Sequence, residues 1–191
     1  PGLDGRKGYQ PRGKGLGGSS SINAMVYIRG HPGDYDDWAA AGNRGWGWSD
    51  VLPLFKRSEH NERGADAFHG IGGPLNVADV RSPNPSSFAF VDAGVQAGNP
   101  RNSDFNGTSP HGVGLYQVTQ KNGRRWSAAR AYLDPAAGRA NLAVLTRAHA
   151  LRLIVEGKAC LGVETTRGTL HARRETILCC GAFGSPQLLL L

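Results

Sequence analysis

The clearest chemical potential lies in a glycine- and serine-rich run, Gly15-Leu-Gly-Gly-Ser-Ser-Ser-Ile-Asn-Ala-Met-Val26. Glycine permits positive φ angles and lets a ligand approach the main chain closely. Exposed backbone N–H groups followed by a helix start form a concavity that binds anions. We therefore interpret the run as a contact segment for a bulky anionic ligand, such as a pyrophosphate or the edge of a flavin ring.

A literal dinucleotide-binding pattern overlaps this run. Gly13-Lys-Gly-Leu-Gly-Gly18 satisfies G-x-G-x-x-G, which in dinucleotide-binding folds follows directly on a hydrophobic strand. The preceding residues, Gly8-Tyr-Gln-Pro-Arg12, are polar and turn-like. We therefore do not interpret the match as that fingerprint, and a glycine-rich loop that serves only as a connector remains the alternative on spacing alone.

Several motifs resemble those of one enzyme family. Residues 13–23, followed by residues 25–30 and Asp34, resemble the first signature of the glucose-methanol-choline (GMC) flavoprotein oxidoreductases. Residues 181–190 resemble the start of the second signature of that family. Further landmarks of the family lie at residues 45–49, 69–75 and 125–133. The run Met25-Val-Tyr-Ile-Arg-Gly-His-Pro32 is most similar to the choline-dehydrogenase-like branch.

The resemblance implies a mixed α/β fold, in which part of an FAD-binding, Rossmann-like domain is interrupted by a substrate-binding domain with an antiparallel sheet. It assigns residues 1–45 to the FAD-binding domain, residues 46–140 to the substrate domain and a lid, and residues 141–191 to the FAD-binding domain again. The family's dinucleotide fingerprint and catalytic histidine have no counterpart here. We therefore expect an internal fragment, incomplete at both ends and inactive alone, that carries no catalytic residue.

The resemblance also implies cofactor contacts at individual positions. These positions are Gly17, Gly18, Ser19, Asn23, Ala24, Met25, Val26, Ala150, Gly181 and Ala182. The physical case is strongest for Asn23, because an amide both donates and accepts hydrogen bonds, as flavin ribityl hydroxyls or ring heteroatoms require. The alternatives are a helix cap at Asn23, an ordinary strand residue at Ala150, and simple strand-to-helix turn chemistry at Gly181 and Ala182.

For the intact enzyme, the resemblance implies oxidation of the CH–OH group of choline or another primary alcohol, with hydride transfer to flavin N5. Some family members attach the flavin covalently to a histidine just before the asparagine, but that position is Ile22 here, so noncovalent FAD is expected. The choice of alcohol and of electron acceptor, oxygen or a quinone-like molecule, stays open. The alternative from another class is a noncatalytic, basic interaction module of the same fold, which would not bind flavin.

Composition limits the classes of partner that the chain is expected to bind. The net charge of +7 suggests an anionic partner, but the basic residues are scattered and no zinc, RNP-like or recognition-helix pattern accompanies them, so nucleic acid is not expected. No apolar run is long enough to span a bilayer. The expected location is the cytoplasm, with peripheral membrane association left open. Cys160, Cys179 and Cys180 cannot form a regular disulfide framework, which indicates a reducing compartment.

Other chemistry-bearing residues have simpler interpretations. The six histidines are dispersed without metal-ligand spacing, so no metal site is expected. His69 is interpreted as stabilising a turn, with shaping of a substrate lid as the alternative. Trp46 and Trp48 are interpreted as core residues rather than the frame of an apolar pocket. Cys179 and Cys180 end an apolar run and are expected to be small buried hydrophobes.

The elements that must position these residues follow from caps and periodicity. Asp34, Ser49 and Ser86 are predicted helix N-caps, with stops at Gly42 for the first helix and Gly98 for the third. Strands are predicted at residues 142–146, 150–155, 161–165, 169–170 and 176–179. Ser185-Pro186 is predicted to open a final helix. The Pro/Gly-rich loops at residues 61–74 and 99–112 are interpreted as a substrate lid or as loops without function.

Overall fold

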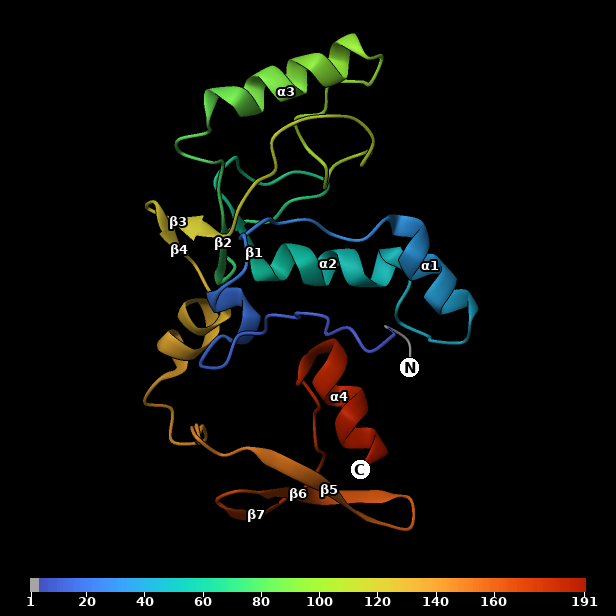
Figure 1. The fold of residues 1–191 in the computed structure, drawn as a ribbon, viewed down its shortest axis with the longest axis vertical. Helices are drawn as coiled ribbons and strands as arrows, with labels where there is room; N and C mark the ends of the chain where they lie inside the picture. Colours follow the sequence, from blue (N-terminus) through green and yellow to red (C-terminus); the bar gives the residue numbers. More distant parts are fainter. Residues whose placement is uncertain (1–3) are drawn as a thin grey trace. The chain divides into compact units, whose positions relative to one another are not determined.

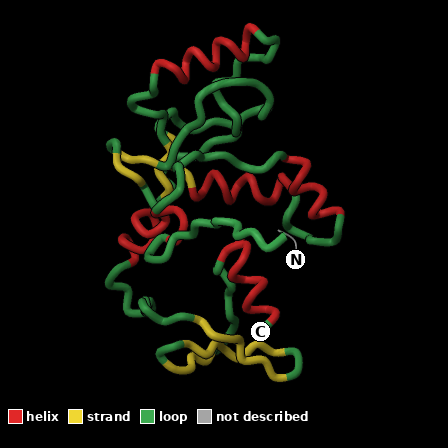
Figure 2. The backbone as a smooth tube through the Cα atoms, viewed as in Figure 1, coloured by secondary structure: helices red, strands yellow, loops and turns green. Residues whose placement is uncertain are grey.

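The computed structural model describes residues 4–191, which form two compact units with their boundary between Arg139 and Ala140. Each unit combines helices with short strands, and no long sheet is present in the described part of the chain (Figures 1 and 2). The expected mixed helix-and-strand class is confirmed. The assignment of three sequence segments to two domains stays a prediction.

The first unit carries most of the elements. In chain order they are η1 (Gly18–Ser21), α1 (Pro32–Ala40), α2 (Trp48–Ser58), β1 (Glu59–Asn61), β2 (Leu75–Val77), α3 (Pro85–Gln96), β3 (Gln120–Lys121), β4 (Arg124–Arg125), η2 (Ala129–Leu133) and η3 (Asp134–Ala136). Here η1 and η3 are 3₁₀-helices and η2 is a single π-helical turn. Because most of these pieces are short, long connecting segments supply much of the unit's packing.

Short strand contacts tie distant segments of this unit together. β1 and β2 pair in parallel with Glu59 opposite Leu75, and β3 and β4 form an antiparallel hairpin. Val118, just before β3, bridges to both Val26 and Ala78. The segment that follows the glycine-rich run is therefore fixed by hydrogen bonds to residues more than ninety positions further along the chain (Figure 1).

The first three helices start two or three residues before the predicted positions. α1 is capped by His31, whose side chain accepts a hydrogen bond from Gly33 N, while Asp34 lies at the third helical position and accepts from His31 N. α2 begins after Gly47, and α3 begins after Asn84. The predicted caps Asp34, Ser49 and Ser86 are therefore wrong. In α1 and α3 a proline occupies the first helical position, which moves the capping position one residue before it.

The second unit is a three-stranded antiparallel meander followed by a helix. Its strands are β5 (Ala150–Glu156), β6 (Ala159–Thr165) and β7 (Gly168–His171), in the order β5-β6-β7, and α4 (Gly181–Leu190) contacts β5. These strands confirm the predictions at residues 150–155, 161–165 and 169–170. β5 and β6 carry a bulge between Ile154 and Val155.

Four predictions for this unit are wrong. The segments 142–146 and 176–179 are not strands, because neither finds a pairing partner among residues 4–191 and an unpaired strand would leave its N–H and C=O groups unsatisfied. The last helix begins at Gly181, before Ser185. Cys179 and Cys180 are exposed, since the strand expected to bury them does not form.

Candidate functional site

The glycine-rich run folds into a tight turn that opens into η1. Gly17 and Gly18 have φ angles of 84° and 54°, in the left-handed region that favours glycine. Gly17 caps η1, and Gly18 N donates to Gly15 O at 3.0 Å. A β-carbon added to Gly18 would meet no heavy atom within 4 Å. The main chain at Gly18 is therefore open to close approach, while its contact with a cofactor stays a prediction.

The other side of the turn is closely packed. A β-carbon on Gly13 would lie 2.1 Å from Gly18 O and 2.7 Å from Ser19 N, and one on Gly17 would lie 2.6 Å from Ser21 Oγ. A side chain at position 13 would fit only if the main chain moved, whereas one at position 17 would first displace the Ser21 hydroxyl. Glycine at 13 and 17 therefore shapes the turn, while glycine at 18 leaves its outer face free.

Three serine hydroxyls hold the turn in place. Ser19 Oγ accepts from Gly13 N at 3.1 Å, and Ser21 Oγ donates to Leu16 O at 2.8 Å. Ser20 Oγ donates to Gly17 O and accepts from Ala128 N at 2.9 Å. The predicted contact residue Ser19 thus has its hydroxyl oxygen engaged within the loop. Its backbone remains part of η1, where the N–H groups of the first turn have no partner within the helix.

Asn23 follows η1, and the oxygen of its side-chain amide already accepts hydrogen bonds from within the protein. Its Oδ1 accepts from Met25 N at 3.0 Å and from Arg125 Nη1 at 2.9 Å. The side chain is exposed and does not cap a helix, because the next helix, α1, is capped by His31. Since two hydrogen bonds occupy the oxygen, the amide offers a ligand only its Nδ2 donors. Of the two expected roles of Asn23, donor and acceptor, the structure leaves only that of donor for a ligand.

Met25 is held in an unusual backbone conformation. Its φ is 66°, which is uncommon for a residue with a side chain. Its N donates to Asn23 Oδ1, and its carbonyl oxygen accepts from Thr119 N at 2.8 Å. Ala24 is exposed beside it, and Val26 bridges to Val118. The structure therefore brings together the predicted contact positions from Gly17 to Val26 on one continuous segment.

The remaining predicted contacts lie in the second unit. Ala150 is the first residue of β5 and pairs with Thr165. Gly181, with a φ of 79°, and Ala182 form the start of α4. The positive φ explains the need for glycine at 181. A role of these three residues in cofactor binding stays a prediction.

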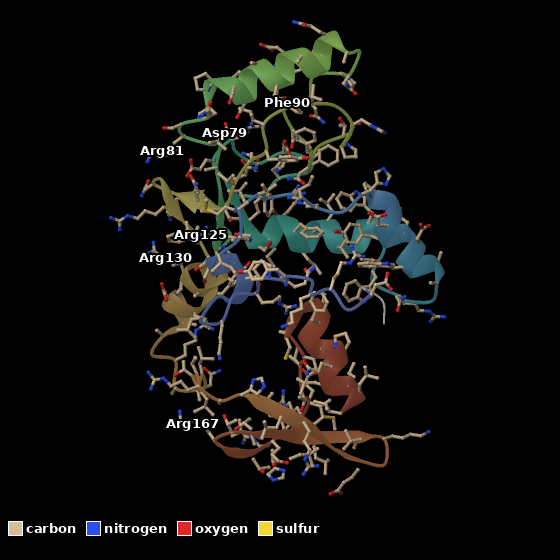
Figure 3. All side chains as sticks on the ribbon, in the orientation of Figure 1. Asp79, Arg81, Phe90, Arg125, Arg130 and Arg167 are labelled. Atoms are coloured by element: carbon tan, nitrogen blue, oxygen red, sulfur yellow. The ribbon has the colours of Figure 1, made fainter. Side chains whose placement is uncertain are left out.

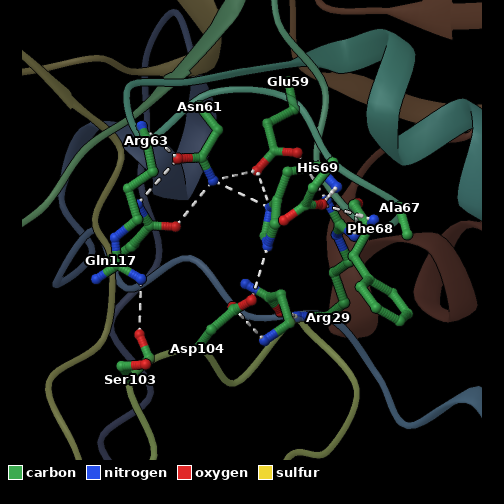
Figure 4. A network of polar contacts seen from close by, with 12 residues as sticks. Arg29, Glu59, Asn61, Arg63, Ala67, Phe68, His69, Ser103, Asp104 and Gln117 are labelled. Atoms are coloured by element: carbon green, nitrogen blue, oxygen red, sulfur yellow. Dashed lines mark hydrogen bonds and ion pairs between the residues drawn. The ribbon is translucent and has the colours of Figure 1, made fainter.

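A buried polar network centres on Arg29, Glu59 and His69 (Figure 4). Arg29 Nη2 pairs with Glu59 Oε2 at 2.8 Å, and the two side chains are 2% and 0% exposed. Glu59 Oε1 also faces His69 Nδ1 at 3.1 Å, and His69 Nε2 faces Asp104 Oδ2 at 3.0 Å. Arg29 Nη1 donates to Phe68 O at 2.7 Å. The network joins the Tyr27–Arg29 segment, β1 and both long loops.

An amide pair completes the network. Asn61 Nδ2 donates to Gln117 Oε1 at 2.9 Å, and Gln117 Nε2 donates back to Asn61 Oδ1 at 3.1 Å. Asn61 Nδ2 also donates to Glu59 Oε1 at 3.0 Å. Both ring nitrogens of His69 face carboxylates, and both donate to them when the ring is protonated; Asn61 Nδ2 also lies 3.0 Å from His69 Nδ1. The loops at residues 61–74 and 99–112 are thus held together by hydrogen bonds of Asn61, His69 and Asp104.

The electrostatics of the network follow from these contacts. The hydrogen bond to Glu59 raises the pKa of His69 above its ordinary value, against the opposing effect of burial, and Asp104 adds to the rise. Burial alone would raise the pKa of Glu59, but hydrogen bonds from His69 and Gly70 and the charge of Arg29 outweigh it and lower that pKa. The opposite shifts indicate that each group stabilises the charged form of the other.

We expect the stability of the fold to depend on pH through this network. The raised pKa of His69 contributes stability that is complete below about pH 6.5, its ordinary value, and is lost as the pH rises through the folded value. The lowered pKa of Glu59 contributes stability that is complete above about pH 4.5 and is lost as the pH falls. Urea unfolding should therefore give a maximum near pH 5–6. In His69→Asn the alkaline decline should be much reduced, and an unchanged decline would contradict the assignment.

Within residues 4–191 no group of three or more histidine, cysteine, aspartate or glutamate side chains is placed to hold a metal ion. Over the same residues, the helices are too short or too polar for any of them to traverse a lipid bilayer. Trp48 packs against Tyr35 and Phe55, with ring centroids 5.6 and 6.5 Å away, whereas Trp46 is 54% exposed. The core interpretation therefore fits Trp48 better than Trp46.

Comparison with known proteins identifies the family. The family model described as GMC oxidoreductase matches residues 2–191. Alcohol dehydrogenase [acceptor] of Pseudomonas putida is 48% identical over 99% of this chain and 36% of its own length. Oxygen-dependent choline dehydrogenase of Brucella ovis is 48% identical over the whole chain and 35% of its own length.

Solved structures give the same result. Pyridoxine 4-oxidase from Mesorbium loti matches with a TM-score of 0.76 at 38% identity, over 83% of this chain and 32% of that one. An FAD-dependent oxidoreductase from Chaetomium thermophilum matches with a TM-score of 0.81 at 30% identity, over 90% of this chain and 33% of that one. Sequence and fold together place the chain among the oxidoreductases. It belongs to the GMC oxidoreductase family, and it spans about a third of the length of its relatives.

Two parts of the site do not follow from the sequence. Arg125 lies in a family landmark, but nothing local predicts that its guanidinium reaches Asn23 across 102 positions of sequence. The pairing of Arg29 with Glu59 is likewise a finding of the structure alone. A single charged residue among polar neighbours has no local sequence pattern that indicates burial. The only indication of the network in the sequence is that the chain contains both acidic and basic residues, Arg29, Glu59 and His69 among them.

Proposed function

We propose that this chain is the flavin-contacting part of an FAD-dependent oxidoreductase that acts on the CH–OH group of an alcohol. The observation that carries the proposal is the glycine-rich turn, which is open at Gly18 and lies next to the free Nδ2 donors of Asn23. This arrangement suits a cofactor that combines phosphate oxygens with a heteroaromatic ring. The relatives named above are alcohol and choline dehydrogenases, which supports an alcohol as substrate.

The residues present fit such a cofactor. A ligand can approach the main chain at Gly18, where the space that a β-carbon would take has no heavy atom within 4 Å. Ser19, Ala24 and Val26 would contribute main-chain and small side-chain surface along it. Asn23 Nδ2 would donate to an acceptor atom of the ligand. When bound, FAD supplies the electron-accepting chemistry that side chains lack.

The role of this chain's own residues is then orientation. The turn is closed by serine hydrogen bonds, and Met25 is fixed by Asn23 and Thr119. Groups held in this way keep the reacting partners aligned and reduce the reorganisation needed for reaction. A proton acceptor for the alcohol is not assigned to any residue of this chain, and we expect it elsewhere in the longer protein.

Noncovalent attachment is part of the proposal. Ile22, directly before Asn23, is 55% exposed and has no nucleophilic atom with which to form a bond to a flavin. We further propose choline or another primary alcohol as substrate, a cytoplasmic location, and the division into FAD-binding segments at residues 1–45 and 141–191 around a substrate-domain segment at residues 46–140. Ala150, Gly181 and Ala182 would contact the cofactor from the last segment.

The test uses the parent protein that contains these residues. We expect it to purify yellow, to release unmodified FAD on denaturation, and to lose its visible flavin absorption when an alcohol is added without oxygen. A panel of choline and simple primary alcohols would identify the substrate class. A folded parent protein that is colourless and cannot be reconstituted with FAD would overturn the proposal and favour the noncatalytic interaction module.

A further inference from the structure

We propose that Arg125 is a positioning residue that sets the orientation of the Asn23 amide, so that Asn23 presents hydrogen-bond donors and no acceptor to the cofactor. This inference rests on the proposed FAD site but adds a residue and a chemical polarity to it. Arg125 belongs to β4, in the hairpin next to η1, and Figure 3 labels it there. In sequence it lies outside the glycine-rich run at residues 15–26.

The geometry shows how Arg125 acts. Its Nη1 donates to Asn23 Oδ1 at 2.9 Å and to Ser20 O at 3.1 Å. One terminal nitrogen therefore ties the side chain of Asn23 to the end of η1. A guanidinium nitrogen is a donor only, so it accepts no hydrogen bond from an amide nitrogen placed at the same position. Arg125 therefore excludes the amide orientation in which oxygen and nitrogen are exchanged.

A second donor reinforces the same orientation. Met25 N lies 3.0 Å from Asn23 Oδ1, and a backbone N–H, like the guanidinium, can only donate. Two donors thus converge on the oxygen and fill its two lone pairs. Within the described residues 4–191, no group accepts a hydrogen bond from Asn23 Nδ2, and the side chain is exposed. Both Nδ2 hydrogens are left for a ligand.

This arrangement selects the chemistry of the ligand atom. A carbonyl oxygen or an unprotonated ring nitrogen accepts from Nδ2, whereas a ligand N–H that points at the same place meets another donor. The oxidised flavin ring offers such acceptors. The orientation also supports Met25, since its left-handed backbone (φ 66°) depends on the hydrogen bond from its N to Asn23. Arg125 thus stabilises the contact segment through Asn23.

A direct contact between Arg125 and an anionic group is the competing role. Arg125 also lines a surface pocket of about 490 Å³ together with Ser21, Arg124, Ser127 and Arg130. A residue that binds an anion directly would act independently of Asn23. A residue that acts through Asn23 would lose its effect when the Asn23 amide is removed. A double-mutant cycle separates the two roles.

The experiment uses the full parent protein, stripped of flavin and titrated with FAD. We expect Arg125→Met to raise the Kd for FAD about tenfold, the effect of one charge-assisted hydrogen bond, and to shift the visible absorption bands of the bound flavin. Arg125→Lys should restore part of the affinity because it retains a donor. Arg44→Met, an exposed arginine between α1 and α2 that does not line this pocket, is the matched control and should bind FAD as the parent does. Circular dichroism checks that each variant is folded.

The cycle with Asn23→Ala decides the mechanism. We expect Arg125→Met to change FAD affinity less than about twofold in the Asn23→Ala background, because the side chain through which it acts is gone. An undiminished tenfold effect in that background, or parent-like affinity in Arg125→Met alone, would overturn the inference while leaving the proposed function intact. Failure of the unsubstituted parent to bind FAD would overturn both.

Discussion

Arg29→Met is expected to destabilise the fold by about 3–5 kcal/mol, because it leaves the Glu59 carboxylate buried without its nearest positive partner. Arg29 and Glu59 are 2% and 0% exposed, and the guanidinium also donates to Phe68 O. Methionine fills much of the same space but donates no hydrogen bond. Urea-induced unfolding of the variant and the parent protein at the same pH measures the difference.

An exposed ion pair provides the matched control. Arg101 and Asp92 approach to 2.5 Å, but both side chains are 56% exposed, so Arg101→Met should cost less than about 1 kcal/mol. The double variant Arg29→Met/Glu59→Gln should recover part of the loss, because it also removes the uncompensated charge. Equal losses of unfolding free energy for Arg29→Met and Arg101→Met would show that the buried pair stabilises the fold no more than the exposed pair.

Gly13→Ala is expected to abolish or greatly weaken FAD binding while the rest of the protein stays folded. The added β-carbon would lie 2.1 Å from Gly18 O and 2.7 Å from Ser19 N, which are backbone atoms that cannot turn aside. The turn must open, which displaces η1 and the Asn23 that follows it. We expect at least a roughly tenfold higher Kd for FAD, the scale of a misplaced binding contact, measured by titration of the flavin-free parent protein.

Leu16→Ala serves as the control in the same loop. Its side chain is 53% exposed and its carbonyl oxygen, which accepts from Ser21 Oγ, is unchanged by the substitution. This variant should bind FAD within about twofold of the parent protein, as expected of an exposed surface position. Parent-like FAD binding by Gly13→Ala would mean that the turn adapts without cost, and would contradict the role assigned to its close packing.

The fold class and the position of the glycine-rich turn could be predicted from local sequence. Glycine at 17 and 18 indicates left-handed backbone, and the apolar residues of β5 and β6 indicate strands, because both signals depend on neighbours in the sequence. Exact boundaries were less predictable. Prolines at the first positions of α1 and α3 moved the capping residues to His31 and Asn84, and the segment 142–146 lacked a partner to make it a strand.

The sequence by itself therefore determined the family, the mixed α/β class and the segment that forms the candidate site. Only the tertiary structure decided which polar groups are satisfied and which remain free. The oxygen of Asn23 is occupied by Arg125 from 102 positions away, and Glu59 meets both Arg29 and His69 inside the first unit. Hydrogen bonds and buried charges depend on distance and direction in space, and no periodicity along the chain records either.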